Sequence, residues 1–216
     1  MRRKRHSPRR DAIPPSLPKF DVGTYVKFPG LNYAHPRPFR NWKDQQLTAA
    51  IGGWLSSNPP GLELATMAYE ELKSRGTDLN AGMKFAAVGL EPIPWLEEAR
   101  VQVRQTFTPD IMEAQMEGRL GANVYVVLRH GYSMENGIYG AYVGSTGKSP
   151  GQRCSEHRKG IRAARGLPRY GIEPLWSLFD FINPVPKARA GREEWETRLH
   201  EALAPVIPKV TGDVTF

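Results

Sequence analysis

Five residues in the second half of the chain carry the side-chain groups that hydrolysis of a phosphodiester requires. Such a reaction delivers a water in line with the bond to be broken and stabilises charge on the phosphoryl and leaving oxygens, usually with a cation, a base and a divalent metal. A cation and a base four residues apart share one face of a helix. A carboxylate is the hard oxygen ligand that Mg²⁺ or Mn²⁺ prefers. The candidates are Tyr125, Tyr142, Arg153, His157 and Glu196.

The two tyrosines lie in sequence runs that are typical of β-strands. Val124–Leu128 is a β-branched and aromatic run, and residues 138–144 form a second one after a polar tip. We predict an antiparallel hairpin with its turn at Asn136-Gly137. In such a hairpin Tyr125 and Tyr142 lie on facing strands.

The remaining candidates lie in predicted helices. Ser149 is a suitable N-cap and Pro150 suits a first helical position, which predicts a helix over residues 152–164. Residues 176–182 (WSLFDFI) are predicted to form a third strand, and residues 192–206 a last helix. The predicted order is therefore β-β-α-β-α.

Short motifs along this order resemble those of the GIY-YIG nucleases, in particular phage-type homing endonucleases and restriction-endonuclease-like catalytic domains. The matching segments are Val124-Tyr125 for GIY, Tyr142-Val143-Gly144-Ser145 for YIG, Arg153 to His157 for the R-x-x-x-H helix, Arg169-Tyr170-Gly171 for the basic-aromatic-glycine turn, and Glu196 with Leu199, Leu203 and Pro205. Gly137-Ile138-Tyr139 spells the first motif literally, but it lies on the same predicted strand as Tyr142. Ala122-Asn123 replaces the glycine of the first motif, and the asparagine often found near the family's C-terminus has no clear counterpart.

The resemblance implies a metal-dependent DNA endonuclease, a phosphodiester hydrolase with one Mg²⁺ or Mn²⁺ bound through Glu196. It also implies that Arg153 stabilises the scissile phosphate, while Tyr125, Tyr142 and His157 position or deprotonate the water, with their individual roles open. The neighbouring carboxylates Glu193 and Glu194 lack the leucine that follows Glu196 by three residues. Further basic residues could grip the phosphate backbone of DNA, namely Lys148, Arg158, Lys159, Arg162, Arg165 and Arg169.

Composition narrows the class of protein. Of the formal net charge of +8, six charges come from the first ten residues, whereas Gly121–Tyr170 carries eight Lys or Arg against two Glu. Cys154 is the only cysteine, which excludes an intrachain disulfide and a thiolate-rich zinc site. No apolar run is long enough to span a bilayer, and prolines interrupt the stretch after the basic start, so we expect a cytoplasmic protein without a membrane segment.

We expect three segments along the chain. Residues 1–19 are predicted to be a disordered basic tail, which either binds phosphates nonspecifically or is merely solvated. Residues 20–120 are predicted to be mostly helical: a loop-rich aromatic wrap at 20–42 precedes amphipathic patterns at 46–56, 62–75 and 94–107. Residues 121–216 are predicted to form the nuclease domain, a small antiparallel β-sheet flanked by helices in an α/β fold.

Three rival functions deserve comparison. Residues 144–149 (GSTGKS) follow a strand and precede a helix as a nucleotide-binding P-loop does, but Tyr142 stands where the first glycine of that loop belongs. Cys154 and His157 could pair as nucleophile and base of a thiol enzyme. The alternative to an enzyme is a non-catalytic nucleic-acid-binding module with a GIY-YIG-like fold.

Overall fold

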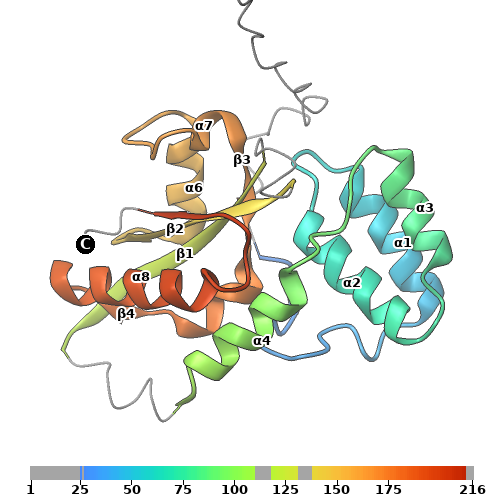
Figure 1. Ribbon diagram of the computed structural model, residues 1–216, viewed down its shortest axis with the longest axis horizontal. Helices are drawn as coiled ribbons and strands as arrows, with labels where there is room; N and C mark the ends of the chain where they lie inside the picture. The colour runs from blue at the N-terminus through green and yellow to red at the C-terminus, as the bar shows by residue number, and fades with distance from the viewer. Residues whose placement is uncertain (1–24, 26, 110–117, 131–137, 213–216) are drawn as a thin grey trace, which may run out of the picture.

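The computed structural model describes residue 25 and residues 27–109, 118–130 and 138–212. Within these residues the protein is a mixed α/β structure with seven α-helices and a five-stranded sheet. Figure 1 shows the first three helices packed side by side at one end and the sheet at the other, with helices above and below it. The expected α/β class is confirmed. The predicted tail at 1–19 and the predicted turn at Asn136-Gly137 lie outside the described residues.

Helices dominate the first half, as the apolar periodicity predicts. They are α1 (Asp44–Leu55), α2 (Leu62–Ser74), α3 (Leu79–Ala87) and α4 (Leu96–Thr106), so the three predicted helices are confirmed to within two residues at each end. Each of those three buries one apolar stripe, such as Leu47, Ile51 and Leu55 on α1. Helix α3 was not predicted, because it is short, buries only Ala81 and Phe85 and exposes its other apolar side chains.

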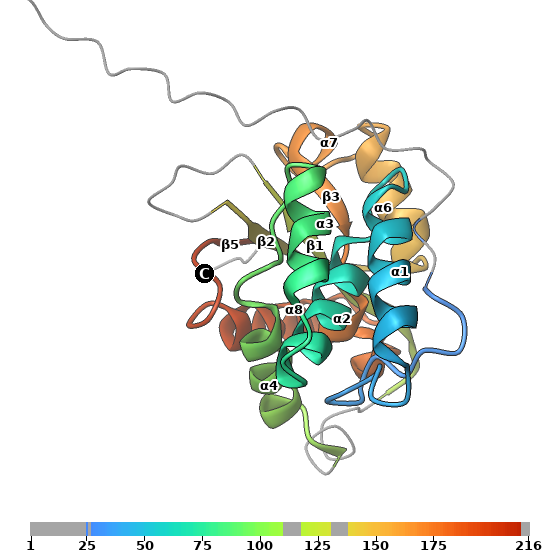
Figure 2. The same cartoon turned by 90° about the vertical axis from the view of Figure 1, so that its right-hand side faces the viewer.

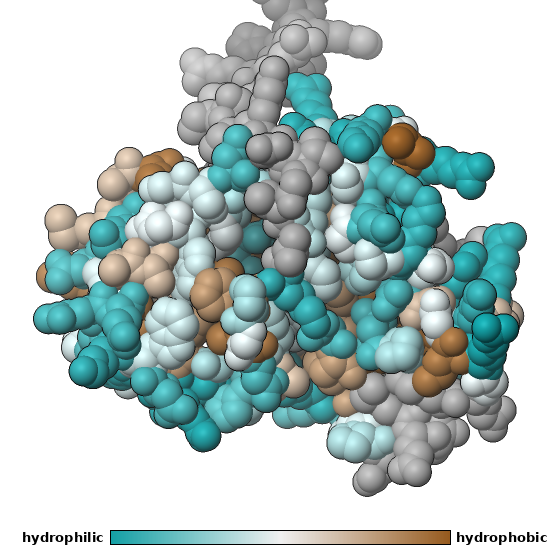
Figure 3. Space-filling view, turned by 180° about the vertical axis from the view of Figure 1, so that it is seen from behind, coloured by the Kyte–Doolittle hydropathy of each residue, from teal (hydrophilic) through white to brown (hydrophobic). Residues whose placement is uncertain are grey.

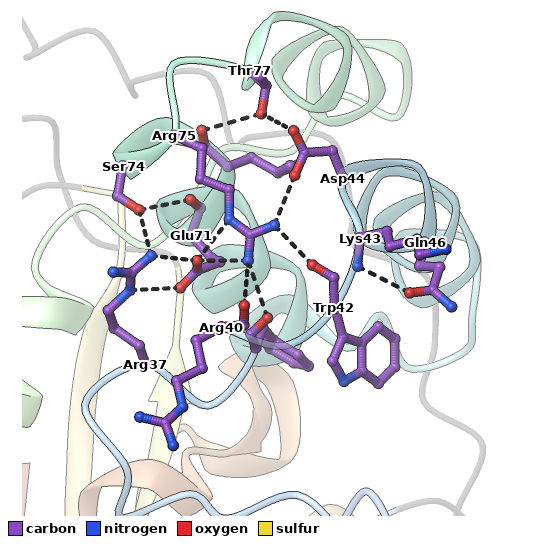
Figure 4. Close-up of polar contacts among 12 residues, drawn as sticks. Arg37, Arg40, Trp42, Lys43, Asp44, Gln46, Glu71, Ser74, Arg75 and Thr77 are labelled. Carbon is purple, nitrogen blue, oxygen red and sulfur yellow. Dashed lines mark hydrogen bonds and ion pairs between the residues drawn. The ribbon is translucent and has the colours of Figure 1, made fainter.

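A network of four charged residues ties the loop before α1 to the end of α2. Both carboxylate oxygens of Glu71 accept hydrogen bonds from Arg37, at 3.0 and 2.6 Å, and one also accepts from Arg75 Nε at 2.8 Å. The other guanidinium nitrogens of Arg75 bind Asp44 and the backbone carbonyls of Phe39, Arg40 and Trp42 (Figure 4). We refer to Arg37, Asp44, Glu71 and Arg75 as the Arg75 network. It orders a loop that has no regular structure of its own.

The sheet is built on the predicted hairpin. Strand β1 (Leu120–Arg129) pairs antiparallel with β2 (Gly140–Thr146), with Tyr125 opposite Gly144 and Val127 opposite Tyr142. The strand order is β3-β1-β2-β5, where β3 is Gly171–Pro174 and β5 is Val210–Gly212. Strand β4 (Val185–Pro186) also pairs with β1, and β5 is parallel to β2. The short strands β4 and β5 were not predicted, because two or three residues carry no periodicity.

The predicted third strand at residues 176–182 is wrong. This segment forms two 3₁₀ turns, Trp176–Leu178 and Asp180–Ile182, and the strand that pairs with β1 comes earlier, as β3. The reason is tertiary: the buried carboxylate of Glu63 accepts the backbone N–H groups of Trp176 and Ser177, at 3.0 and 2.7 Å. Amide groups bound in this way cannot serve a sheet ladder.

The boundaries of the helices that carry candidate residues also differ from the predicted ones. The helix after the hairpin, α6 (Pro150–Arg158), starts at the predicted Ser149 cap but ends six residues early, because Gly160 (φ 75°) and Arg162 (φ 46°) are left-handed. A four-residue helix, α7 (Leu167–Tyr170), follows it. The last helix, α8 (Arg189–Leu203), starts and ends three residues earlier than predicted, so it also includes Arg189.

The helical and sheet-containing regions share one apolar core. Helix α4 runs between them, and Phe107 at its end stacks on Trp195 of α8 with ring centroids 5.6 Å apart. Figure 2, turned from Figure 1, shows α1 and α3 in front of the sheet, with α6 and α7 at its upper side and α8 below. The face seen in Figure 3 is largely hydrophilic, with hydrophobic residues scattered among charged ones. Across the described ranges, no helix has the length and apolarity to cross a membrane.

Candidate active site

The two predicted tyrosines lie on neighbouring strands and on the same face of the sheet. Their ring centroids are 6.1 Å apart, and both rings flank Gly144. A Cβ atom on Gly144 would lie 2.6 Å from the hydroxyl of Tyr125 and 2.8 Å from Cε1 of Tyr142. The residue in the third position of the YIG-like motif is therefore a glycine because the rings occupy the space of a side chain.

His157 lies behind Tyr125. Its Nε2 is 2.7 Å from the Tyr125 hydroxyl, and its Nδ1 accepts the backbone N–H of Ala164 at 3.2 Å. Burial, together with the charge of Arg153, lowers the pKa of His157 to about 4, so the ring is neutral at neutral pH. Because Nδ1 is an acceptor, the single proton is on Nε2 and is donated to Tyr125. His157 therefore positions the tyrosine.

The same arrangement keeps Tyr125 protonated. Burial, with a contribution from Tyr142, raises the pKa of its hydroxyl well above the usual range, although the charge of Arg153 acts in the opposite direction. The oxygen accepts a hydrogen bond from His157, so its own proton is available to a group on the other side. Tyr125 can thus donate to, and orient, a molecule in front of the sheet.

Arg153 lies on α6 beside the tyrosines and holds the loop that follows its own helix. Its guanidinium donates to the carbonyls of Ile161, at 3.3 Å, and Arg162, at 2.8 Å, and it pairs with Glu156 at 3.3 Å. These contacts fix the side chain in place, which explains why the chain turns back after Arg158. The side chain remains 19% exposed, so part of it is accessible to a ligand.

Four of the five predicted site residues border one hollow of about 380 Å³. Tyr125 and Tyr142 contribute from the hairpin, Arg153 from α6, and Glu196, which is only 7% exposed, from α8. His157 is not part of this lining. The other lining residues are Ser145, Arg189, Arg192 and Glu193.

The donor set of the hollow fits a hydrated Mg²⁺ or Mn²⁺ ion. Such an ion needs only one or two carboxylates, with water and substrate oxygens completing its shell, and Glu196 supplies a carboxylate on a hollow with room for water. Within the described residues no group of three or more His, Cys, Asp or Glu gathers to form a protein-only cage. Of the two rival carboxylates, Glu194 is exposed, and Glu193 pairs with Arg189 at 2.7 Å.

The predicted DNA-binding residues are dispersed. Lys148 and Arg162 border a second hollow of about 710 Å³, which shares Ser145, Arg153 and Arg192 with the first one. Lys148 forms an ion pair with Glu156. Arg158 donates to the carbonyl of Pro168, and Arg169 lies over the ring of Tyr170 at 5.1 Å. Lys159 and Arg165 are exposed and border neither hollow.

Two rival sites lose their geometric basis. Cys154 is buried, and burial raises the pKa of its thiol to about 12, which disfavours the thiolate that a nucleophile needs. Gly144, Ser145 and Thr146 of the P-loop-like segment belong to β2, so their backbone is used by the sheet rather than by a phosphate cradle.

Tyr139 of the literal GIY triplet is buried, and its hydroxyl donates to the carbonyl of Glu91 at 3.2 Å, away from the hollow.

No protein-family model, curated protein sequence or solved structure matches this chain. The resemblance to the GIY-YIG nucleases therefore rests on the short motifs of the sequence.

Sequence reasoning missed the arginines of α8. Arg192 stands one helical turn before Glu196, a spacing that places both on one face of a helix, and this spacing was the available signal. It was overlooked because the helix was predicted to begin at Arg192 itself. Arg189 lay outside that prediction altogether.

Proposed function

We propose that the protein is a metal-dependent DNA endonuclease that hydrolyses phosphodiester bonds in the hollow between the hairpin, α6 and α8, as GIY-YIG nucleases do. The observation that carries this proposal is the convergence of Tyr125, Tyr142, Arg153 and Glu196 from four separate segments of the chain on one hollow. Residues so distant in sequence share a hollow only through the fold. Their types supply a cation for the phosphoryl charge, a metal ligand, and two hydroxyl groups that can orient a water.

Each residue has a role that follows from its surroundings. Arg153 stabilises the charge that develops on the scissile phosphate, since its fixed guanidinium costs little to reorganise. Tyr125, held by His157, and Tyr142 orient the water that attacks phosphorus. Glu196 holds Mg²⁺ or Mn²⁺, which when bound supplies the charge that lowers the pKa of the attacking water and stabilises the leaving oxygen. We do not assign the role of general base to His157, because it lies behind Tyr125 and both of its ring nitrogens already form hydrogen bonds.

The test is cleavage of supercoiled plasmid with Mg²⁺ and with EDTA, comparing wild-type protein with Arg153→Ala and Glu196→Gln. We expect nicking or linearisation that needs the metal, and a loss of about 100- to 1000-fold in rate for each variant. Glu196→Gln preserves the size of the side chain, so it separates chemistry from packing. Matched controls are Glu201→Gln, an exposed carboxylate on the same helix, and Arg40→Ala, whose guanidinium points away from the Arg75 network (Figure 4).

The alternative function is a non-catalytic nucleic-acid-binding module. Binding of plasmid, single-stranded DNA and RNA without cleavage of any of them, by a protein whose melting curve shows it to be folded, would support that alternative and overturn the proposed endonuclease. Metal dependence separates the two cases, because simple binding persists in EDTA and hydrolysis stops.

A further inference from the structure

The second hollow borders the first one and carries an excess of positive charge. Its lining contains four cations, Lys148, Arg153, Arg162 and Arg192, against one carboxylate, Glu156. Glu156 accepts from both Lys148 and Arg153, so these two cations have a protein partner. The charge of the other two arginines is not balanced by the lining.

Among the arginines that the structure describes, Arg162 and Arg192 differ from most others because their side chains have no partner among the described residues. In the part of the chain that the structure describes, neither guanidinium forms a hydrogen bond or an ion pair. Arg192 is half-buried even so, with its Nη1 beside Gly147, where a Cβ atom would lie 4.0 Å away. A half-buried arginine without a partner gives up hydration without recovering its hydrogen bonds.

The position of Arg192 in its helix adds to this cost. Arg192 and Arg189 lie within the first four residues of α8, and no acidic residue stands in the first turn. The helix dipole is positive at this end, so cations there are unfavourable unless an anion compensates for them. Arg189 is compensated by Glu193, whereas Arg192 is not.

Arg192 also borders both hollows. The tyrosines and Glu196 border only the smaller hollow, and Arg162 borders only the larger one. A chain of phosphates that passes from one hollow to the other passes the three residues that border both, Ser145, Arg153 and Arg192, and of the two cations among them Arg192 is the one without an ion pair to a described residue. Guanidinium groups suit this task because their planar donors match phosphate oxygens.

We propose that the larger hollow binds the phosphate next to the scissile phosphate, through Arg192 and Arg162. This inference rests on the proposed function and narrows its substrate to polynucleotide strands with at least two consecutive phosphodiesters. A dinucleotide or a small phosphodiester can occupy the smaller hollow but gains nothing from the larger one.

The first experiment measures binding alone, so that it does not depend on cleavage. A fluorescent DNA duplex is titrated in EDTA at several NaCl concentrations with wild-type protein, Arg192→Ala, Arg162→Ala and the control Arg40→Ala. Loss of one phosphate contact is expected to weaken binding about tenfold for each hollow variant and to lower the slope of log K against log salt by about 1. Arg40→Ala should match wild type. Equal affinities and salt slopes for all four proteins would overturn the inference.

The second experiment locates the contact on the DNA. Neutral methylphosphonates replace the phosphates of the duplex one position at a time, and binding is measured for wild type and Arg192→Ala. One or two positions should weaken wild type about tenfold and leave Arg192→Ala unchanged, since that contact is already lost. If every position affects the two proteins equally, Arg192 does not bind a phosphate and the inference fails.

Cleavage then separates this inference from the proposed function. Arg192→Ala is expected to raise KM for the oligonucleotide about tenfold more than it raises KM for a dinucleotide with one phosphodiester. Arg153→Ala should impair both substrates. A wild-type protein that cleaves neither substrate but shows the position-specific binding effect would contradict the endonuclease and retain the second phosphate site. Equal loss of both substrates in Arg192→Ala would place Arg192 on the scissile phosphate and overturn the inference.

Discussion

Two clusters of arginine and glutamate in this protein have similar composition and opposite surroundings. In the Arg75 network, the nitrogens of Arg75 bind Glu71, Asp44 and three backbone carbonyls, all of them protein groups (Figure 4). Around the paired hollows, Arg192 and Glu196 border open space on the same helix. The guanidinium of Arg75 is satisfied by protein groups and stabilises the fold, whereas the guanidinium of Arg192, which forms no ion pair with a described residue, borders two hollows and is available to a ligand.

A third cluster, the carboxyl pair of Glu63 and Glu173, lies between the helical region and the sheet-containing region. It is neither a network of ion pairs nor an open site. Glu63 on α2 accepts the backbone N–H groups that open the first 3₁₀ turn, and Glu173 on β3 accepts the backbone N–H of Glu63 at 2.7 Å. Burial raises the pKa of Glu63 to about 7, and burial together with the charge of Glu63 raises the pKa of Glu173 well above its usual range. This carboxyl pair fastens the helical region to the sheet-containing region.

Among substitutions of residues other than the four that converge on the hollow, the largest effect is expected at Gly144, because the two tyrosine rings lie against it. Gly144→Ala would push a Cβ atom into the Tyr125 hydroxyl. We expect cleavage to fall about 100-fold, as for other misplacements of about 1 Å, and the free energy of unfolding to fall by about 1 to 3 kcal/mol. Plasmid cleavage and urea denaturation measure the two quantities.

Gly53→Ala is the matched control for that substitution. A Cβ atom at Gly53, inside α1, meets nothing within 4 Å, so the variant should be more stable by about 0.5 to 1 kcal/mol and should cleave normally. Unchanged cleavage by Gly144→Ala would show that the tyrosines tolerate displacement and do not order the reaction.

Glu71→Ala is expected to lower the stability of the protein and to leave cleavage nearly unchanged. It leaves Arg37 and Arg75 without their shared carboxylate, and we expect the free energy of unfolding to fall by about 2 kcal/mol. Rates of plasmid cleavage below the melting transition should stay within about twofold of wild type. Glu70→Ala removes only a 3.8 Å surface pair with Lys73, so it should change stability by less than about 0.5 kcal/mol. A cleavage defect in Glu71→Ala would mean that the two clusters are coupled.

The carboxyl pair of Glu63 and Glu173 is expected to make stability depend on pH. Both folded pKa values are raised above the ordinary value for a Glu carboxyl, about 4.5, so the pair favours the folded state below about pH 4.5, and this contribution is lost as the pH rises through 7 and beyond. The expected slope is about 1.4 kcal/mol per pH unit for each proton released. Glu173→Gln keeps an acceptor for the Glu63 amide without a charge, so its stability should exceed that of wild type above pH 8 and vary less with pH. Denaturation between pH 5 and pH 9 checks this, and parallel curves for the two proteins would contradict it.

The local elements and the types of the chemical groups could be predicted from the sequence alone. Helices α1, α2 and α4, the β1–β2 hairpin and the Ser149 cap follow from apolar periodicity, turn chemistry and capping, which act between residues close in sequence. The chemical types of Tyr125, Tyr142, Arg153 and Glu196, and the short motifs that contain them, singled out these residues. That these four residues border the same hollow could not be derived from interactions between residues close in sequence.

Tertiary structure decided the rest. The amides of Trp176 and Ser177 turn away from a strand because Glu63, more than a hundred residues earlier, accepts them. The loop after α6 folds back because Arg153 binds its carbonyls, and His157 takes a positioning role because the amide of Ala164 fixes its tautomer. Only the tertiary structure shows that Arg192 borders two hollows. In each case a partner from another segment outweighs the local preference, since satisfying a buried polar group is worth more than secondary-structure propensity.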